Sequence, residues 1–226
     1  AQALVPIRSD GMERPLSFTQ QRLWFLEQLQ PGTCVYNITR TMRVPGSLDV
    51  EALRTSVDEI IRRHEALRSL VSVVAGDPVF KVSAPRPAAL PVIDLRAIPK
   101  AEREERALRL ASEEARRPFD LSAGPLVRVS LLRMDEEEHW LLLSMHHIIS
   151  DWWSVSVFFE ELNALYASFT QGMPSPFKPL ECQFSDFAVW QRKKLEAGVL
   201  DDPLDYWKRT LAAAPRSCAR CSRRGA

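Results

Sequence analysis

Apolar residues recur along the chain at two spacings, and the spacing changes several times from one end to the other. Helical spacing of three to four residues predicts six helices, over residues 19–30, 50–64, 100–117, 153–169, 185–196 and 203–213. Runs of β-branched and aromatic residues bounded by Gly and Pro predict strands over 35–44, 70–74, 78–82, 127–134 and 139–145. Helices and strands that alternate in this way predict an α/β layered fold.

Proline and glycine residues near the N-terminus indicate where the predicted fold starts. Residues 1–16 contain Pro6, Gly11 and Pro15 and develop no apolar period, so they are predicted to form a linker. Ser17 then occupies a helix N-cap position, and Gln20 completes the spacing of a capping box.

Composition and charge narrow the class of protein. Hydrophobic residues make up 46% and charged residues 26%, which is typical of globular chains and excludes disorder. Thirty basic and 29 acidic residues leave a formal net charge of +1, so nothing favours a polyanion, and neither nucleic acid nor an anionic membrane is expected as a partner. The longest uncharged apolar region, residues 140–149, is too short to span a bilayer.

The cysteines and the N-terminus indicate the compartment. Cys34, Cys182, Cys218 and Cys221 are too few and too scattered for a disulfide framework. No basic patch is followed by an apolar core near the N-terminus, so no signal peptide is indicated. A cytoplasmic location is therefore expected.

Candidate chemistry gathers at residues 145–151, where a predicted strand ends and a helix begins. The strand fixes position there, and a helix N-terminus offers unpaired N–H donors. One interpretation makes the histidine pair a core residue beside a surface residue, and a second makes one histidine a proton carrier. A third makes His147 and Asp151 metal ligands, but it needs one more protein ligand, and His64 and His139 give no reason to converge there.

Four motifs, in order along the chain, carry a resemblance to a known family. They are SFTQQRLWFL at 17–26, RHEALRS at 63–69, HHIISD at 146–151 and SDFAVWQ at 185–191. Together they resemble condensation domains of nonribosomal peptide synthetases, a branch of the chloramphenicol-acetyltransferase-like superfamily, whose histidine motif reads H-H-x-x-x-D-G. The resemblance runs from about residue 15 to about residue 213. It implies an α/β lobe in which helices cover a mixed sheet.

The resemblance also implies roles for individual residues. The family joins two carrier-bound thioesters: the α-amine of the acceptor aminoacyl group attacks the donor carbonyl. By this analogy the catalytic group is His147, and His146 is structural. Because neighbouring side chains of a strand point to opposite faces, the His147 ring is expected on the open side and the His146 ring in the interior. Asp151 is expected to organise the loop through an ion pair with Arg63 or Arg68, within about 4 Å. No metal or bound cofactor is implied, because phosphopantetheine thioesters arrive on donor and acceptor carrier proteins beside adjacent synthetase domains.

Two departures from the family pattern bear on activity. Trp152 stands where the motif has glycine; its indole would line the channel used by the pantetheine arm, or turn into the core beside Trp153, and it would be strained if φ were positive. Family members are about twice as long, which suggests that this chain corresponds to one lobe. The expected organisation is a linker at 1–16, an N-terminal lobe at 17–213 and an atypical basic tail at 214–226.

Two hypotheses compete with a peptide-forming condensation domain. The chain could be a catalytically inactive relic, or a related carrier-dependent epimerisation or ester-forming domain.

Overall fold

The computed structural model describes residues 13–199 and 201–212. The chain divides into two compact units, residues 1–189 and 190–226. The predicted tail at 214–226, including Cys218 and Cys221, lies outside the described residues, as do residues 1–12 of the predicted linker.

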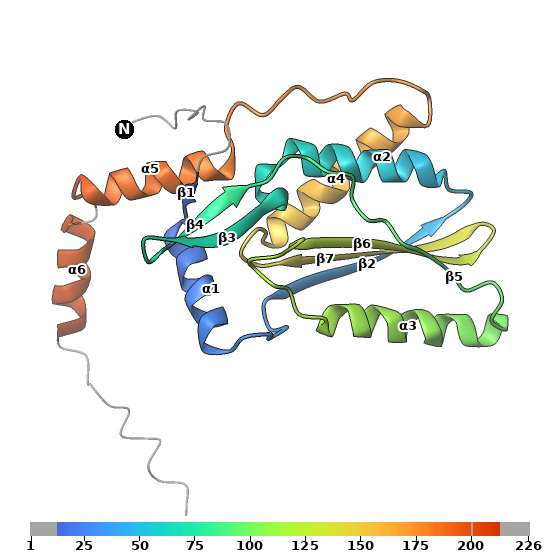
Figure 1. The fold of residues 1–226 in the computed structure, drawn as a ribbon, viewed down its shortest axis with the longest axis horizontal. Helices are drawn as coiled ribbons and strands as arrows, with labels where there is room; N and C mark the ends of the chain where they lie inside the picture. Colours follow the sequence, from blue (N-terminus) through green and yellow to red (C-terminus); the bar gives the residue numbers. More distant parts are fainter. Residues whose placement is uncertain (1–12, 200, 213–226) are drawn as a thin grey trace, which may run out of the picture. The chain divides into compact units, whose positions relative to one another are not determined.

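A four-stranded sheet forms the centre of the first unit. Its strand order is β2 (Asn37–Pro45), β7 (Glu138–His146), β6 (Val127–Asp135) and β5 (Val92–Asp94) (Figure 1). The neighbours β2–β7 and β7–β6 are antiparallel, whereas β5 runs parallel to β6. The sheet is therefore mixed, as expected. The short strand β5 has no counterpart among the predicted elements.

Helices cover both faces of this sheet. The helices α2 (Val50–Arg63) and α4 (Trp152–Phe169) lie on one face, and α3 (Lys100–Arg116) lies on the other (Figure 1). The side chains of β7 are almost all buried, because each face of the strand meets a helical layer. Two apolar clusters result, a large one beneath α2 and α4 and a smaller one beneath α3.

A second, three-stranded sheet has the order β1 (Arg14–Pro15), β4 (Asp77–Val82) and β3 (Ser69–Val74). Because β1 pairs with β4, Arg14 is 8% exposed and Leu16 is fully buried. Residues 14–16, which the sequence places in a linker, are therefore part of the fold.

The helix α1 (Phe18–Leu29) begins with the predicted capping box. The Ser17 side chain accepts the Gln20 N–H, and the Gln20 side chain accepts the Ser17 N–H. A short 3₁₀ helix, η1 (Glu65–Arg68), connects α2 to β3.

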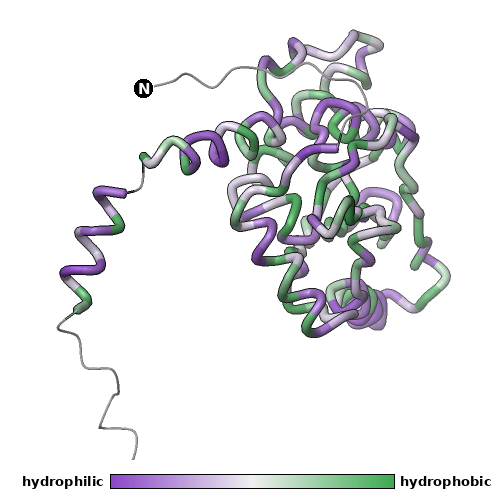
Figure 2. Tube along the Cα trace, turned by 60° about the vertical axis from the view of Figure 1, so that its left-hand side comes forward, coloured by the Kyte–Doolittle hydropathy of each residue, from purple (hydrophilic) through white to green (hydrophobic). Residues whose placement is uncertain are grey.

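Two helices complete the described chain. They are α5 (Phe184–Glu196) and α6 (Asp201–Ala212), and hydrophilic and hydrophobic residues alternate along α6 (Figure 2). Across residues 13–199 and 201–212, none of the helices has both the length and the apolar character needed to cross a membrane.

Candidate functional site

The histidine motif lies where β7 ends and α4 begins. The His146 N–H donates to the Leu126 carbonyl at 3.0 Å, and the His147 N–H donates to the Tyr36 carbonyl at 2.8 Å. Two backbone bonds to different segments therefore anchor the loop at its first residues.

His146 faces the interior, as expected, with 1% of its surface exposed. Its Nδ1 accepts the Ile148 N–H at 3.0 Å, and its ring meets Tyr36 and Phe119 edge-on at 6.3 and 6.1 Å between centroids. Burial, helped by the charge of neighbouring His147, lowers the pKa of His146 to about 4. The ring is therefore neutral near pH 7 and carries its proton on Nε2.

His147 is exposed, in contrast to its neighbour. Its Nδ1 lies 2.7 Å from the Ser150 carbonyl oxygen. Because a carbonyl only accepts, Nδ1 carries the hydrogen, and none of the described residues forms a hydrogen bond with Nε2 of the neutral ring. An exposed imidazole held in this tautomer can accept a proton at Nε2.

Asp151 is the N-cap of α4. One carboxylate oxygen accepts the Ser154 N–H at 2.8 Å and the Ser154 hydroxyl at 2.7 Å. The side-chain and backbone hydrogen bonds from Ser154 hold the pKa of Asp151 below its usual value.

The expected ion pair of Asp151 with Arg63 or Arg68 is wrong. The Arg63 Nε instead lies 2.9 Å from Glu161, whose other oxygen lies 2.7 Å from His64 Nε2. Arg68 donates to a backbone carbonyl and lies 3.7 Å from Glu65. The cap satisfies the Asp151 carboxylate locally, while α4 presents Glu161 to the end of α2, so the arginine finds its partner there.

Gln20 is a site residue that the sequence shows only as a helix cap. Its side chain is 4% exposed, and its Nε2 donates to the Ile148 carbonyl at 2.9 Å while its Oε1 accepts the Ser17 N–H at 2.9 Å. The first motif thus holds the histidine loop directly. No spacing signal in the sequence joins residues 128 positions apart.

Trp152 is the first residue of α4, and its side chain is 64% exposed. Its neighbour Trp153 is 77% exposed, so the alternative of a pair turned into the core is wrong. Among the described non-glycine residues only Ala75 has a positive φ, so the indole brings no backbone strain. The Arg40 guanidinium lies 5.8 Å from the Trp152 ring centroid.

The third interpretation of the histidine motif, a metal site, has no support in the described part of the chain. No three His, Cys, Asp or Glu side chains gather there in a group that could hold a metal ion. Cys34 and Cys182 are free thiols.

Solved structures share this fold. The chain superimposes on the X-domain in its complex with OxyB from teicoplanin biosynthesis with a TM-score of 0.83 and 27% identity, covering 95% of this chain and 46% of that one. The starter condensation domain of rhizomide synthetase RzmA gives a TM-score of 0.80 at 20% identity, with 91% of this chain and 49% of that chain covered, which is a likeness of fold.

Curated relatives are large synthetases. A linear gramicidin synthase of Brevibacillus parabrevis is 46% identical over 88% of this chain and 4% of its own length. Phosphinothricin tripeptide synthetase PhsC of Streptomyces viridochromogenes is 40% identical over 89% of this chain and 18% of its own length. The chain therefore spans a small part of these relatives and about half of the solved domains.

The family model described as "Condensation domain" matches residues 12–218, which include all four motifs and the whole site. The chain belongs to the condensation domain family of nonribosomal peptide synthetases, of which it represents part of one domain.

Proposed function

We propose that this chain is the histidine-bearing lobe of a condensation domain that forms a peptide bond between two carrier-bound thioesters. The observation that carries the proposal is His147, exposed at the end of β7, with Nδ1 bonded to the Ser150 carbonyl and no described residue bonded to Nε2. Membership of the condensation family supports the reaction class.

In the proposed step the α-amine nitrogen of the acceptor attacks the donor thioester carbonyl. A C–N bond forms, the C–S bond breaks, and the thiolate leaves on the donor arm. The proton lost by the amine passes to His147 Nε2 and from there to the departing sulfur. Because thioesters are activated and an α-amine titrates near pH 8, positioning of the two substrates supplies a large share of the rate.

The residues that hold the histidine loop act through His147. His146 and Gln20 both hold Ile148, one through its N–H and the other through its carbonyl. Asp151 caps α4 and so sets where the loop turns into the helix. These residues are positioning residues in the proposal, and His147 is the catalytic residue.

Partners follow from the reaction. Donor and acceptor carrier proteins present the phosphopantetheine thioesters, adjacent synthetase domains surround the lobe, and the location is cytoplasmic. Trp152 lines the channel for the pantetheine arm, since its exposed indole lies five residues after His147.

One observation favours an inactive chain as the second candidate. An exposed indole occupies the place where the family motif has glycine, on the first turn of α4 beside the catalytic loop. The same bulk would obstruct an arm that approaches His147.

Activity of a reconstituted domain tests the proposal. The chain is fused to the second half of a condensation domain from the linear gramicidin synthase named above, and dipeptidyl-carrier product is measured by mass spectrometry. We expect product from the fusion, none with His147→Ala, and unchanged product with the matched exposed variant Ser156→Ala. Little or no product is expected from the unfused chain.

The variant Trp152→Gly separates the two candidates. Higher turnover of the fusion with glycine supports an obstructing indole in an active lobe. Product that persists in the His147→Ala fusion would refute the catalytic assignment, and a fusion that stays inactive with glycine restored would favour the inactive chain.

A further inference from the structure

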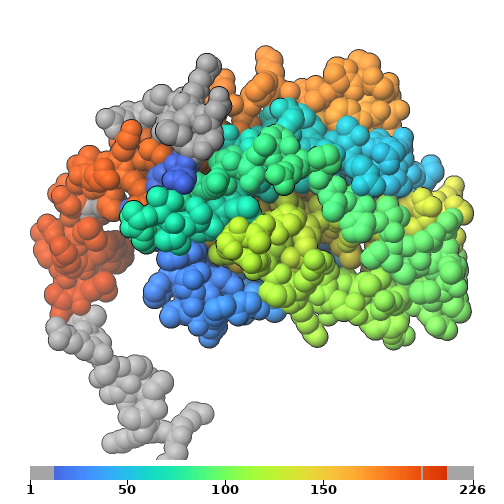
Figure 3. All heavy atoms as spheres, viewed as in Figure 1, coloured from blue at the N-terminus to red at the C-terminus, as the bar shows by residue number. Residues whose placement is uncertain are grey.

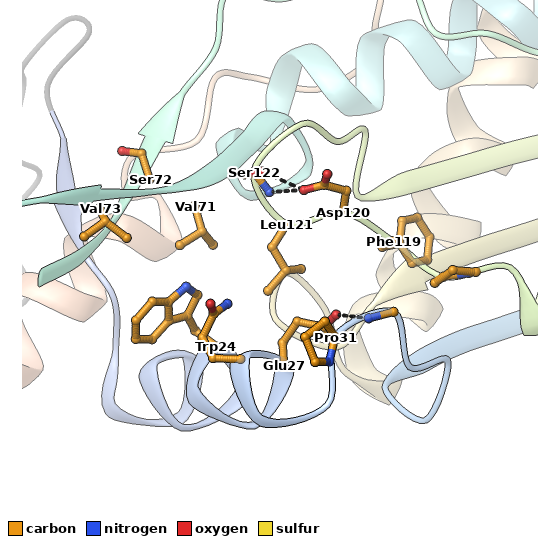
Figure 4. A pocket seen from close by; sticks show the side chains of 13 residues that line it. Trp24, Glu27, Pro31, Val71, Ser72, Val73, Phe119, Asp120, Leu121 and Ser122 are labelled. Atoms are coloured by element: carbon orange, nitrogen blue, oxygen red, sulfur yellow. Dashed lines mark hydrogen bonds between the residues drawn. The ribbon is translucent and has the colours of Figure 1, made fainter. Parts of the chain in front are cut away.

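A hollow of about 570 Å³ lies beside α1, on the side where the helix faces β3 (Figure 4). It is bounded by α1 and the turn after it, by β3, and by residues 118–122. Figure 3 shows α1, in blue, directly below the hairpin of β3 and β4, in teal. Neither His147 nor any other member of the histidine loop is among the described residues that line this hollow.

At the floor of the hollow lies a carboxylate with only one of its two oxygens hydrogen-bonded to a described residue. Glu27 is 7% exposed, and its Oε1 accepts the Gly32 N–H at 2.9 Å. Its Oε2 is buried and has no hydrogen-bond partner among the described residues. A buried acceptor left unpaired is costly, so the arrangement favours a ligand that donates a hydrogen bond to Oε2.

The charge of the lining selects the sign of that ligand. Glu27 and Asp120 both line the hollow, and none of the other described lining residues is Lys, Arg or His. Hydrogen bonds from Ser122 hold the pKa of Asp120 below its usual value, so its carboxylate is charged near pH 7. Arg128, which lies against the lining residue Phe119, is paired with Glu114. Two carboxylates without a lining cation favour a cationic ligand.

The walls select the body of the ligand. Val71 and Leu121 point toward the side chains of α1, where Trp24 presents its indole (Figure 4). Phe119 closes another side. Aromatic faces attract cations, and apolar walls reward the burial of a hydrocarbon body.

We propose that this hollow is a binding site for a primary ammonium ion carried on a compact apolar or aromatic body. The ammonium donates to Glu27 Oε2, Asp120 adds negative potential, and the body packs between Trp24 and Leu121. The site is independent of the proposed peptide-bond formation, because none of its residues belongs to the catalytic loop.

Calorimetric titration of the 226-residue chain with phenethylammonium chloride tests the proposal. We expect saturable binding of phenethylammonium, and binding at least about tenfold weaker for the neutral analogue 2-phenylethanol, because a hydrogen bond to a charged group is worth about 1.5–3 kcal/mol. Equal affinity for the two probes, or no saturable binding of the ammonium, overturns the proposal.

A variant locates the site. Glu27→Gln keeps the acceptor for the Gly32 N–H and removes the charge, so it should weaken phenethylammonium binding about tenfold, while the exposed control Glu51→Gln should not. Unchanged binding in folded Glu27→Gln also overturns the proposal. If Glu27→Gln does not fold, Asp120→Asn replaces it. Weaker binding of phenethylammonium with unchanged binding of 2-phenylethanol is then the expected result, and unchanged binding of the ammonium overturns the proposal.

Discussion

The buried amide of Gln20 allows a direct test of how the histidine loop is held. Substitution Gln20→Glu keeps the shape of the side chain and the acceptor for the Ser17 N–H. It replaces the N–H group that donates to the Ile148 carbonyl, at 2.9 Å, with an oxygen that can only accept when ionised. Two oxygens then face one another in a place that is 4% exposed.

The magnitude follows from that geometry. The lost hydrogen bond is worth about 1 kcal/mol, and the buried carbonyl left without a donor costs about 1–3 kcal/mol more. We therefore expect the free energy of unfolding at pH 7 to fall by about 2–4 kcal/mol. A protonated glutamate can donate again, and burial raises its folded-state pKa. The deficit relative to the unchanged chain should then be smallest below about pH 4.3 and should grow as the pH rises.

Urea unfolding of both chains at pH 7 and at pH 4 measures the effect, with the exposed Gln28→Glu on the same helix as the control. Nitrogen NMR of the His147 ring gives a second readout, which a general loss of stability leaves unchanged. We expect the Nδ1–H tautomer to be less populated in folded Gln20→Glu than in the unchanged chain. A loss below about 0.5 kcal/mol, equal to that of Gln28→Glu, would refute the bond to Ile148.

Substitutions at three further positions test the remaining contacts. The folded-state pKa of His146, about 4, lies below its ordinary value of about 6.5, so this residue should cost the chain about 3 kcal/mol of stability as the pH falls from 6.5 to 4. In urea unfolding, His146→Phe should flatten that dependence on pH. The same variant should lose about 1–3 kcal/mol at pH 7, because the Ile148 N–H is left unpaired. An equal slope in both chains would contradict this. Asp151→Ala should lower stability by about 1 kcal/mol and Asp151→Asn by a few tenths, because asparagine also caps; equal losses would indicate that the charge matters. Glu161→Gln should cost about 3–5 kcal/mol, because it leaves Arg63 with no anionic partner in the described part of the chain, and a thermal midpoint unchanged within error would exclude that role.

Much of the fold could be predicted because its signals are local. The capping box at Ser17 marks a helix start that the structure confirms, and the Asp49 side chain likewise caps α2. The strands predicted over 70–74 and 78–82 pair as the hairpin of β3 and β4, with the turn signal Gly76-Asp77 between them. The short strands β1 and β5 were missed, since strands of two and three residues carry no period and exist only through their neighbours.

The site was less accessible to sequence reasoning. Alternation along a strand correctly separates buried His146 from exposed His147. The choice of partner for Arg63 depends on how α2 and α4 pack, and the carboxylate that reaches it is Glu161 and not Asp151. The link from Gln20 to Ile148 is missed for the same reason, because only the folded chain brings the two motifs into contact.

The paired histidines at the end of β7 have a consequence for insertions and deletions. Side chains alternate along a strand, so a one-residue slip of β7 against β6 exchanges the two faces. After a one-residue insertion within β7, an imidazole would still reach the open side, but it would be that of His146. It would lack the Ser150 carbonyl at its Nδ1, and Met145 would take the inward position whose ring now accepts the Ile148 N–H. The duplicated residue is therefore no spare copy, and the length of β7 is under as much constraint as the identity of the histidine it presents.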